Sequence, residues 1–458
     1  WVFVPFYTRS MVYTMPEFLE RRYNPQSRTI LSVISLVSYV LTKVAVTVYA
    51  GGLVFQQVFG IKELWGIDFF WIAAIGLVVL TALYTIFGGM KSVLYTSVLQ
   101  TPILLLGSLI ILVLGFKELG GWDEMMRVCG AVTVNDYGDT MTNLIRSNDD
   151  ANFPWLGALI GSAIIGFWYW CTDQFIVQRV LSGKNEMEAR RGTIFGAYLK
   201  LLPVFLFLIP GMIAFALHQK YIGAGGEGFL PMLANGTANA DAAFPTLVAK
   251  LLPAGVKGLV VCGILAALMS SLASLFNSSA MLFTIDFYKR FKPETPEKKL
   301  VGIGQIATIV IVVLGILWIP IMRSVGDVLY TYLQDVQSVL APGIAAAFLL
   351  GICWKRTSAQ GGMWGLISGM VIGLTRLGAK VYYSNAGEVA DSTFKYLFYD
   401  MNWLFFCGWM FLFCIIVVIV VSLATEAPTA EKIQGLVFGT ATKEQKAATR
   451  ASWNHWDI

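Results

Sequence analysis

Residues 403–423 read WLFFCGWMFLFCIIVVIVVSL and contain no charged side chain. A helix rises about 1.5 Å per residue, so this run is long enough to cross roughly 30 Å of hydrocarbon. Long apolar runs also occupy residues 30–58 and 69–87. They lack strand-like alternation and are too long for the strands of a transmembrane barrel. The stretch therefore predicts an all-α, polytopic membrane protein.

Composition supports this class and argues against several others. Of 458 residues, 57% are hydrophobic and 13% are charged, whereas soluble domains carry about a quarter charged residues. The six cysteines contain no CxxC pair, and His218 and His455 are the only histidines. A disulfide framework, a zinc site and histidine-based catalysis are therefore not expected, and no enzyme is predicted. The net charge of +5 does not by itself imply a nucleic-acid partner.

We predict ten complete spans after an opening apolar stub. They lie at residues 28–58, 68–90, 93–116, 154–180, 192–217, 253–284, 300–320, 327–352, 359–382 and 402–424. Residues 1–424 are expected to form one transmembrane transporter domain, and residues 425–458 a polar segment. The chain opens at Trp1 inside an apolar run, so we expect that it lacks its natural beginning.

Basic residues concentrate in one set of alternate connections. These include Arg21, Arg22 and Arg28, then Lys289 to Lys299, then Lys355 and Arg356. The long connection at 117–153 is instead rich in Asp and Glu. The positive-inside rule puts the basic set and the tail after Thr425 on the cytoplasmic side of the membrane. We expect this membrane to be the plasma (bacterial inner) membrane.

Helix breakers punctuate three of these spans. Gly88 and Gly89 are expected to allow a tight turn between two spans. Pro203 and Pro210 should interrupt a helix, although packing geometry alone also explains such prolines. Pro342, with the glycine after it, suggests a further interrupted helix, which could bring an amide into a cavity.

Polar side chains at membrane depth mark candidate sites, because an unpartnered polar group is costly there. Lys43 lies about fifteen residues into its span, near the bilayer middle, and is a candidate substrate contact. Lys200 either snorkels toward the cytoplasm or points inward. Gln334 and Gln337 share a helix face, where they line a cavity or join neighbouring helices.

Two further clusters stand out. Residues 166–174 read GFWYWCTDQ, whose aromatic rings suit the C–H face of a sugar and whose polar groups suit its hydroxyls. An interfacial aromatic belt is the alternative. Ala267, Ser270 and Ser271 follow i, i+3, i+4 spacing, so their oxygens can converge on a hard cation such as Na⁺. Small-residue helix packing is the alternative for these serines.

Specific motifs make the chain similar to the sodium/solute symporter family, and within it to the sodium/glucose cotransporter branch. The resemblance runs from Trp1 to about Leu423. Its motifs are TMPEFL at 14–19, ALYTIFGG at 82–89, WYWCTDQ at 168–174, IVQR at 176–179, SSLAS at 270–274, FNS at 276–278, FTID at 283–286 and FLLGICWKR at 348–356.

The resemblance implies a LeuT-like transporter fold of two inverted five-helix halves with extra C-terminal helices. It implies that the stub belongs to the second core helix, so the first core helix, and a final helix, lie outside this chain. It further implies that Ala267, Ser270 and Ser271 bind the co-transported Na⁺. Tyr169 matches the aromatic gate that stacks on sugar, Trp170 its neighbour, and Lys200 and Gln334 match hydroxyl-binding side chains.

One departure bears on stoichiometry. Relatives with a second sodium site have an Asp and a Thr where this chain has Ser97 and Ala273. Without the carboxylate, the strongest oxygen ligand of that site is lost, so we predict one Na⁺ per sugar.

The implied function is sodium-coupled symport of a glucose- or galactose-like monosaccharide by alternating access. A polyol such as myo-inositol or a small carboxylate is the nearest alternative substrate, and a sugar sensor without transport is another class. The expected partners are the sugar and the lipid bilayer, with no nucleic acid and no obligatory protein partner.

Overall fold

The computed structural model describes residues 2–10, 12, 14–233, 236–325, 328–386 and 390–453, so Trp1 and His455 lie outside the described residues. The chain forms two compact units from interleaved segments. The first consists of Trp1–Thr42, Ala151–Ala197 and Ser278–Ile458. The second consists of Lys43–Asp150 and Tyr198–Asn277. Each unit is described by itself below.

The regular secondary structure among the described residues of the first unit is all helical. Its elements are α1 (Phe3–Ser10), α2 (Met15–Arg22), α3 (Pro25–Ser38), α7 (Trp155–Cys171), α8 (Gln174–Leu181), most of α9 (Glu186–Leu199), the π-helical η4 (Leu282–Tyr288), α13 (Lys289–Phe291), α14 (Glu297–Val325), α15 (Leu329–Cys353), α16 (Ala359–Asn385), α17 (Thr393–Lys395), the π-helical η5 (Tyr396–Asp400), α18 (Trp403–Ala424), α19 (Ala430–Ile433) and α20 (Lys443–Ala451). The π-helical η1 (Tyr39–Val44) leads from this unit into the second.

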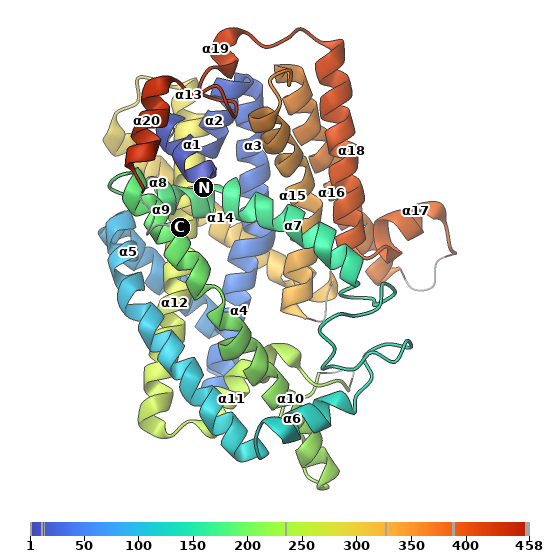
Figure 1. Ribbon diagram of the computed structural model, residues 1–458. Coiled ribbons are helices and arrows are strands. Elements are labelled where there is room, and N and C mark those ends of the chain that lie inside the picture. Colours follow the sequence, from blue (N-terminus) through green and yellow to red (C-terminus); the bar gives the residue numbers. More distant parts are fainter. Residues whose placement is uncertain are drawn as a thin grey trace. The chain divides into compact units, whose positions relative to one another are not determined.

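Helices α15, α16 and α18 lie side by side in the first unit (Figure 1). Their close approach depends on small residues: a Cβ atom added at Gly369 would lie 2.6 Å from the Cα of Gly343. One added at Gly161 of α7 would lie 2.8 Å from the backbone oxygen of Leu404. In a membrane, where helix association depends on tight packing, glycines let backbones meet in this way.

The second unit contains the one β-hairpin of the described residues. Strands β1 (Glu63–Leu64) and β2 (Ile67–Asp68) pair antiparallel around Trp65 and Gly66, whose φ angles are both positive. Its other elements are α4 (Ala45–Phe59), α5 (Phe69–Leu119), α6 (Trp122–Gly130), the π-helical η2 (Val204–Leu208), α10 (Ile209–Gly223), the 3₁₀ turn η3 (Ala240–Ala242), α11 (Ala243–Leu251) and most of α12 (Ala254–Met281). Helices α5, α10 and α11 share a buried core around Ile213, Leu217 and Leu247.

Seven helical stretches among the described residues are long and apolar enough to cross a membrane, or eight if α7 and α8 together count as one span. The predicted tight turn at Gly88 and Gly89 is wrong, because α5 continues through both glycines. Glycine permits a turn but does not compel one, and the helix keeps its backbone hydrogen bonds satisfied. Within α5, residues Ser97–Leu119 are by themselves long and apolar enough to cross a membrane. The stretch Phe69–Leu83 of the same helix is also apolar but shorter.

The predicted proline interruption is confirmed. Regular α-helix ends at Leu199, Pro203 precedes the π-helical η2, and α10 starts at Ile209 with Pro210 in its first turn. Proline lacks a backbone N–H, which explains the loss of the regular pattern. By contrast, α15 runs through Pro342 without interruption, so the interrupted helix predicted there is wrong.

Candidate functional site

The aromatic cluster lies beside a helix break. Helix α7 ends at Cys171 and α8 starts at Gln174, with a bend of 44° between them. Asp173 caps α8, since its carboxylate accepts from the backbone N–H of Phe175. The sequence predicted one span at residues 154–180. The structure locates the break at Thr172 and Asp173.

Two predicted sugar contacts pack against each other in the last turn of α7. The rings of Tyr169 and Trp170 meet edge to face with centroids 5.1 Å apart. The ring of Trp168, on the other side in the sequence, also meets the Tyr169 ring edge to face. Tyr169 is half-buried, whereas the side chain of Trp170 is 50% exposed. An edge-to-face pair leaves ring surface available, which is the feature that a sugar ring can stack on.

Gln334, a third predicted contact, lies on α15 in the same unit. Its side chain is half-buried and its amide donates to the Tyr330 hydroxyl at 2.9 Å. The next residue, Asp335, instead pairs with Lys380 and lies 3.6 Å from the guanidinium of Arg376, both on α16. Its charge is thus used in an ion-pair cluster, whereas the amide of Gln334 is neutral.

Lys43 and Lys200 are described within the second unit. Lys43 is half-buried in the π-helical η1, a type of distortion that often occurs at functional sites. Lys200 is exposed in the turn between α9 and η2. The structure therefore brings Tyr169 and Trp170 into contact. Lys43 lies in η1, and Lys200 lies in a different segment, the turn before η2.

The predicted sodium-binding turn is part of an unbroken α-helix, α12, so its i, i+3, i+4 spacing holds. Ala267 is half-buried, Ser270 is buried and Ser271 is exposed. The Ser270 hydroxyl lies 2.6 Å from the hydroxyl of Ser97 on α5. Ser97 is the residue that stands where some relatives were expected to have a carboxylate. A pair of bonded hydroxyls therefore occupies this part of the second unit.

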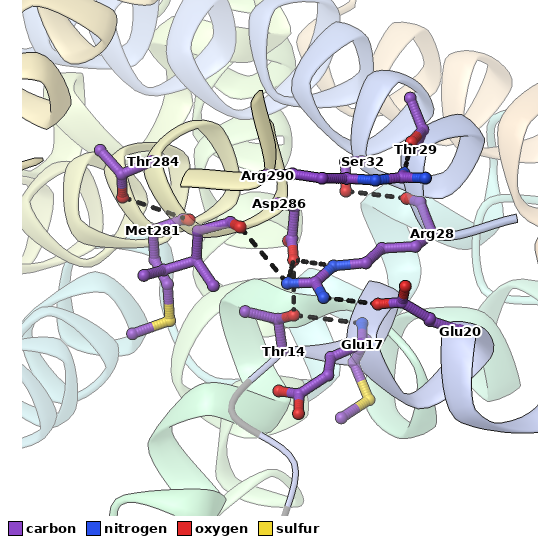
Figure 2. Close-up of polar contacts among 12 residues, drawn as sticks. Thr14, Glu17, Glu20, Arg28, Thr29, Ser32, Met281, Thr284, Asp286 and Arg290 are labelled. Atoms are coloured by element: carbon purple, nitrogen blue, oxygen red, sulfur yellow. Dashed lines mark hydrogen bonds and ion pairs between the residues drawn. The ribbon is translucent and has the colours of Figure 1, made fainter. Parts of the chain in front are cut away.

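A charge cluster that the sequence did not reveal lies in the first unit (Figure 2). Asp286 of η4 is fully buried and accepts from the Arg28 guanidinium at 2.7 Å. Arg28 also pairs with Glu20 at 2.6 Å, and the Thr14 hydroxyl donates to Asp286 at 3.1 Å. Thr14 additionally accepts from the backbone of Glu17 as the N-cap of α2. The cluster ties η4 to the connection between α2 and α3.

A second contact strengthens this junction. Arg290 donates to the backbone of Pro25 at 2.8 Å and to the Thr29 hydroxyl at 2.6 Å. Asp286 closes the FTID motif, which could be recognised in the sequence. Its partner Arg28 is 258 residues away, so spacing gave no signal for the pair.

Comparisons with known proteins fit this geometry. The sequence model described as "Sodium:solute symporter family" matches residues 1–369. The sodium/mannose cotransporter of Bos taurus is 36% identical over 456 residues, covering 97% of this chain and 75% of the relative. Sodium/glucose cotransporter 1 of Ovis aries is 37% identical, covering 93% and 66%. Sodium/myo-inositol cotransporter 2 of Homo sapiens is 35% identical, covering 96% and 66%.

A solved structure is also similar. It is the substrate-bound outward-open state of a Na⁺-coupled sialic acid symporter, with a TM-score of 0.69 and 21% identity, covering 94% of this chain and 81% of that chain. This likeness confirms the predicted all-α, LeuT-like transporter fold. The protein is therefore a multi-pass integral membrane protein.

Replacing Asp286 tests the charge cluster. Asp286→Asn removes the charge that neutralises Arg28 in a buried place, so the free energy of unfolding should fall by about 3 kcal/mol. Asp391→Asn is the matched control, because Asp391 pairs with Lys395 while 94% of its side chain is exposed, and this change should leave the free energy of unfolding close to the wild-type value. Unfolding of both variants in detergent measures the difference, and equal losses would contradict the assignment.

Proposed function

The chain belongs to the sodium:solute symporter family, and on that premise we propose that the whole protein carries out sodium-coupled symport of a monosaccharide. The observation that carries this proposal is the similarity, over more than nine-tenths of the chain, to cotransporters for mannose and glucose. The chain spans about two thirds to three quarters of the length of these relatives. As a member of a transporter family it is a transporter and not an enzyme.

The sugar site that we propose starts from the edge-to-face pair of Tyr169 and Trp170. Tyr169 stacks on the sugar ring at the end of α7, next to the helix break. The amide of Gln334, in the same unit, binds hydroxyls of this sugar. Lys43 and Lys200 of the second unit stay separate predictions of hydroxyl-binding groups. Aromatic faces and uncharged amides suit a neutral ring with many hydroxyls, which favours a sugar over a small carboxylate.

The sodium site that we propose uses oxygens of Ala267, Ser270 and Ser271 on α12. Hard cations prefer oxygen ligands, and this turn presents a backbone carbonyl and two hydroxyls at helical spacing. The contact between Ser97 and Ser270 supports a single ion, because a hydroxyl stands where a second site needs a carboxylate. Na⁺ is thus co-transported in a ratio of one per sugar.

Coupling requires that each ligand prefers one conformation. Na⁺ stabilises the outward-open form and shapes the sugar pocket, and sugar binding then favours closure. Rotation of Tyr169 releases both ligands inward. Moving one positive charge inward gains about 2.3 kcal/mol per 100 mV of membrane potential, before the concentration gradient is counted.

A polyol is the second candidate substrate. The relative from Homo sapiens is a sodium/myo-inositol cotransporter at a similar identity, and a ring of hydroxyls presents the same groups as a sugar. A sugar-binding sensor remains the candidate of another class, since it would use the same pocket without transport.

The basic connections and the tail lie on the cytoplasmic side in this proposal. Within the first unit the tail contacts residues in or next to the basic connections: the Lys432 ammonium donates to the backbone oxygen of Glu20 at 3.0 Å, and the backbone N–H of Phe438 donates to the backbone oxygen of Ile352 at 2.7 Å. Arg190 donates to Ser452 at 3.0 Å. Because these contacts join the tail to the Lys- and Arg-rich segments, one side of the membrane holds both.

Uptake into proteoliposomes tests the function. An inward Na⁺ gradient should drive accumulation of labelled glucose, galactose or mannose above equilibrium, with a Na⁺-to-sugar flux ratio near one, as expected for a single ion site. A panel that includes myo-inositol identifies the preferred substrate. A flux ratio near two would refute the single site, and sugar binding without counterflow would favour the sensor.

Ser271→Ala tests the sodium site. Loss of one oxygen ligand should raise the Na⁺ concentration for half-maximal uptake about ten-fold, since contacts to charged groups contribute about 1.5 kcal/mol. Ser279→Ala on the same helix is the control, because the buried Ser279 hydroxyl has no hydrogen-bond partner among the described residues. Unchanged sodium activation in the Ser271 variant would remove this residue from the site.

Protease access tests the orientation. Trypsin should cut the tail at Lys443, Lys446 or Arg450 in inside-out vesicles, where cytoplasmic segments face the bath, and should spare it in right-side-out vesicles. Detergent-treated vesicles serve as the control for cleavability. Tail cleavage in right-side-out vesicles would reverse the assignment.

A further inference from the structure

The break between α7 and α8 leaves backbone groups that a continuous helix would have paired. Thr172 and Asp173 both donate to the backbone oxygen of Trp168, at 3.0 and 3.1 Å, so two N–H groups share one carbonyl. The carbonyls that follow, and the first N–H groups of α8, need other partners because water is scarce at membrane depth.

Three segments of the first unit form hydrogen bonds at the break, and two of them supply partners for its backbone groups. The Tyr7 hydroxyl of α1 donates to the Cys171 oxygen at 2.7 Å. The Tyr39 hydroxyl of η1 donates to the Asp173 carboxylate at 3.0 Å and accepts from the Phe175 backbone at 3.0 Å. The side-chain oxygen of Gln174 accepts from the Met15 backbone, at the start of α2, at 2.8 Å.

All of the side chains in these bonds are buried. Tyr7, Tyr39, Asp173 and Gln174 are each at most 4% exposed. Burial raises the free-energy cost of losing such a bond, because a buried donor or acceptor that loses its partner has no water to replace it. These hydrogen bonds of Tyr7 and Tyr39, which we call the anchors, therefore fix the ends of α7 and α8 at the break. Tyr169 lies only two residues before Cys171.

We propose that Tyr7 and Tyr39 are positioning residues for the sugar site, which fix the break after α7 and so hold Tyr169 and Trp170 in the geometry that binds sugar. This inference rests on the proposed function, since it names what the anchored turn is for. When an anchor is lost, a smaller fraction of molecules holds Tyr169 and Trp170 in the sugar-binding geometry. The apparent affinity for sugar falls in proportion to that fraction.

Conservative substitutions separate positioning from general stability. Tyr39→Phe should raise the sugar concentration for half-maximal binding about five-fold, the ratio that corresponds to one lost hydrogen bond, while half-saturation by Na⁺ stays the same. Tyr7→Phe should act in the same direction. Tyr23→Phe is the matched control: it also removes a buried hydroxyl, which donates to Ala347 at 2.7 Å, but lies away from the break.

A second readout does not depend on sugar transport. Cys171 lies at the break and is half-buried, while Cys262 is exposed in the second unit. Thiol labelling of the whole protein, quantified for each peptide by mass spectrometry, should show a several-fold rise of Cys171 relative to Cys262 in Tyr39→Phe and none in Tyr23→Phe. If wild-type protein moves no sugar, the proposed function fails while this labelling still tests the anchors.

Asp173 gives the rescue test. Asp173→Asn retains an oxygen that accepts from both Tyr39 and Phe175, so its labelling ratio and sugar affinity should stay close to wild type, whereas Asp173→Ala should resemble Tyr39→Phe. The proposal is overturned if Tyr39→Phe matches Tyr23→Phe in both labelling and sugar half-saturation, or if the Asn and Ala variants of Asp173 are equally impaired.

Discussion

A backbone N–H or C=O group at membrane depth needs a hydrogen-bond partner, because leaving it unpaired costs several kcal/mol. A helix can therefore be interrupted there only where other groups replace the lost bonds. In this protein the interruption after Cys171 coincides with the arrival of Tyr7, Met15 and Tyr39 from three other segments. The proposed sugar gate follows from this arrangement, since the aromatic pair at the end of α7 takes its position from the anchored turn.

The same constraint governs the buried charges. Asp286 is neutralised by Arg28, and Asp335 by Lys380 with Arg376 nearby. The Arg376 guanidinium additionally lies 4.0 Å from the centre of the Phe406 ring. Such pairs contribute little net stability over apolar packing, but loss of one member leaves an uncompensated charge. They therefore fix which helix ends meet in the first unit more than they strengthen it.

The sequence predicted features that depend on local composition and spacing. The apolar runs, the proline interruption before α10, the helical spacing around Ser270 and the aromatic cluster at Tyr169 are all of this kind. Contacts between distant segments could not be predicted: Tyr39 and Asp173 are 134 residues apart, and Arg28 and Asp286 are 258 apart. The two errors, at Gly88 and Pro342, share a cause. Both residues permit a break without compelling one: α5 continues through Gly88, and α15 continues through Pro342 although proline has no N–H to donate to the preceding turn.

The contact between Ser97 and Ser270 bears on how an ion competes for this turn. A sodium ion that takes the Ser270 hydroxyl as a ligand must outweigh its bond to Ser97, and a neutral hydrogen bond contributes only about 1 kcal/mol. A contact between a hydroxyl and a charged group contributes about 1.5 to 3 kcal/mol, which exceeds that cost. A carboxylate at the Ser97 position would change the balance, since it would attract a cation of its own. With a hydroxyl there, the two serines can serve one ion or bind each other, which is consistent with the single coupled Na⁺ proposed above.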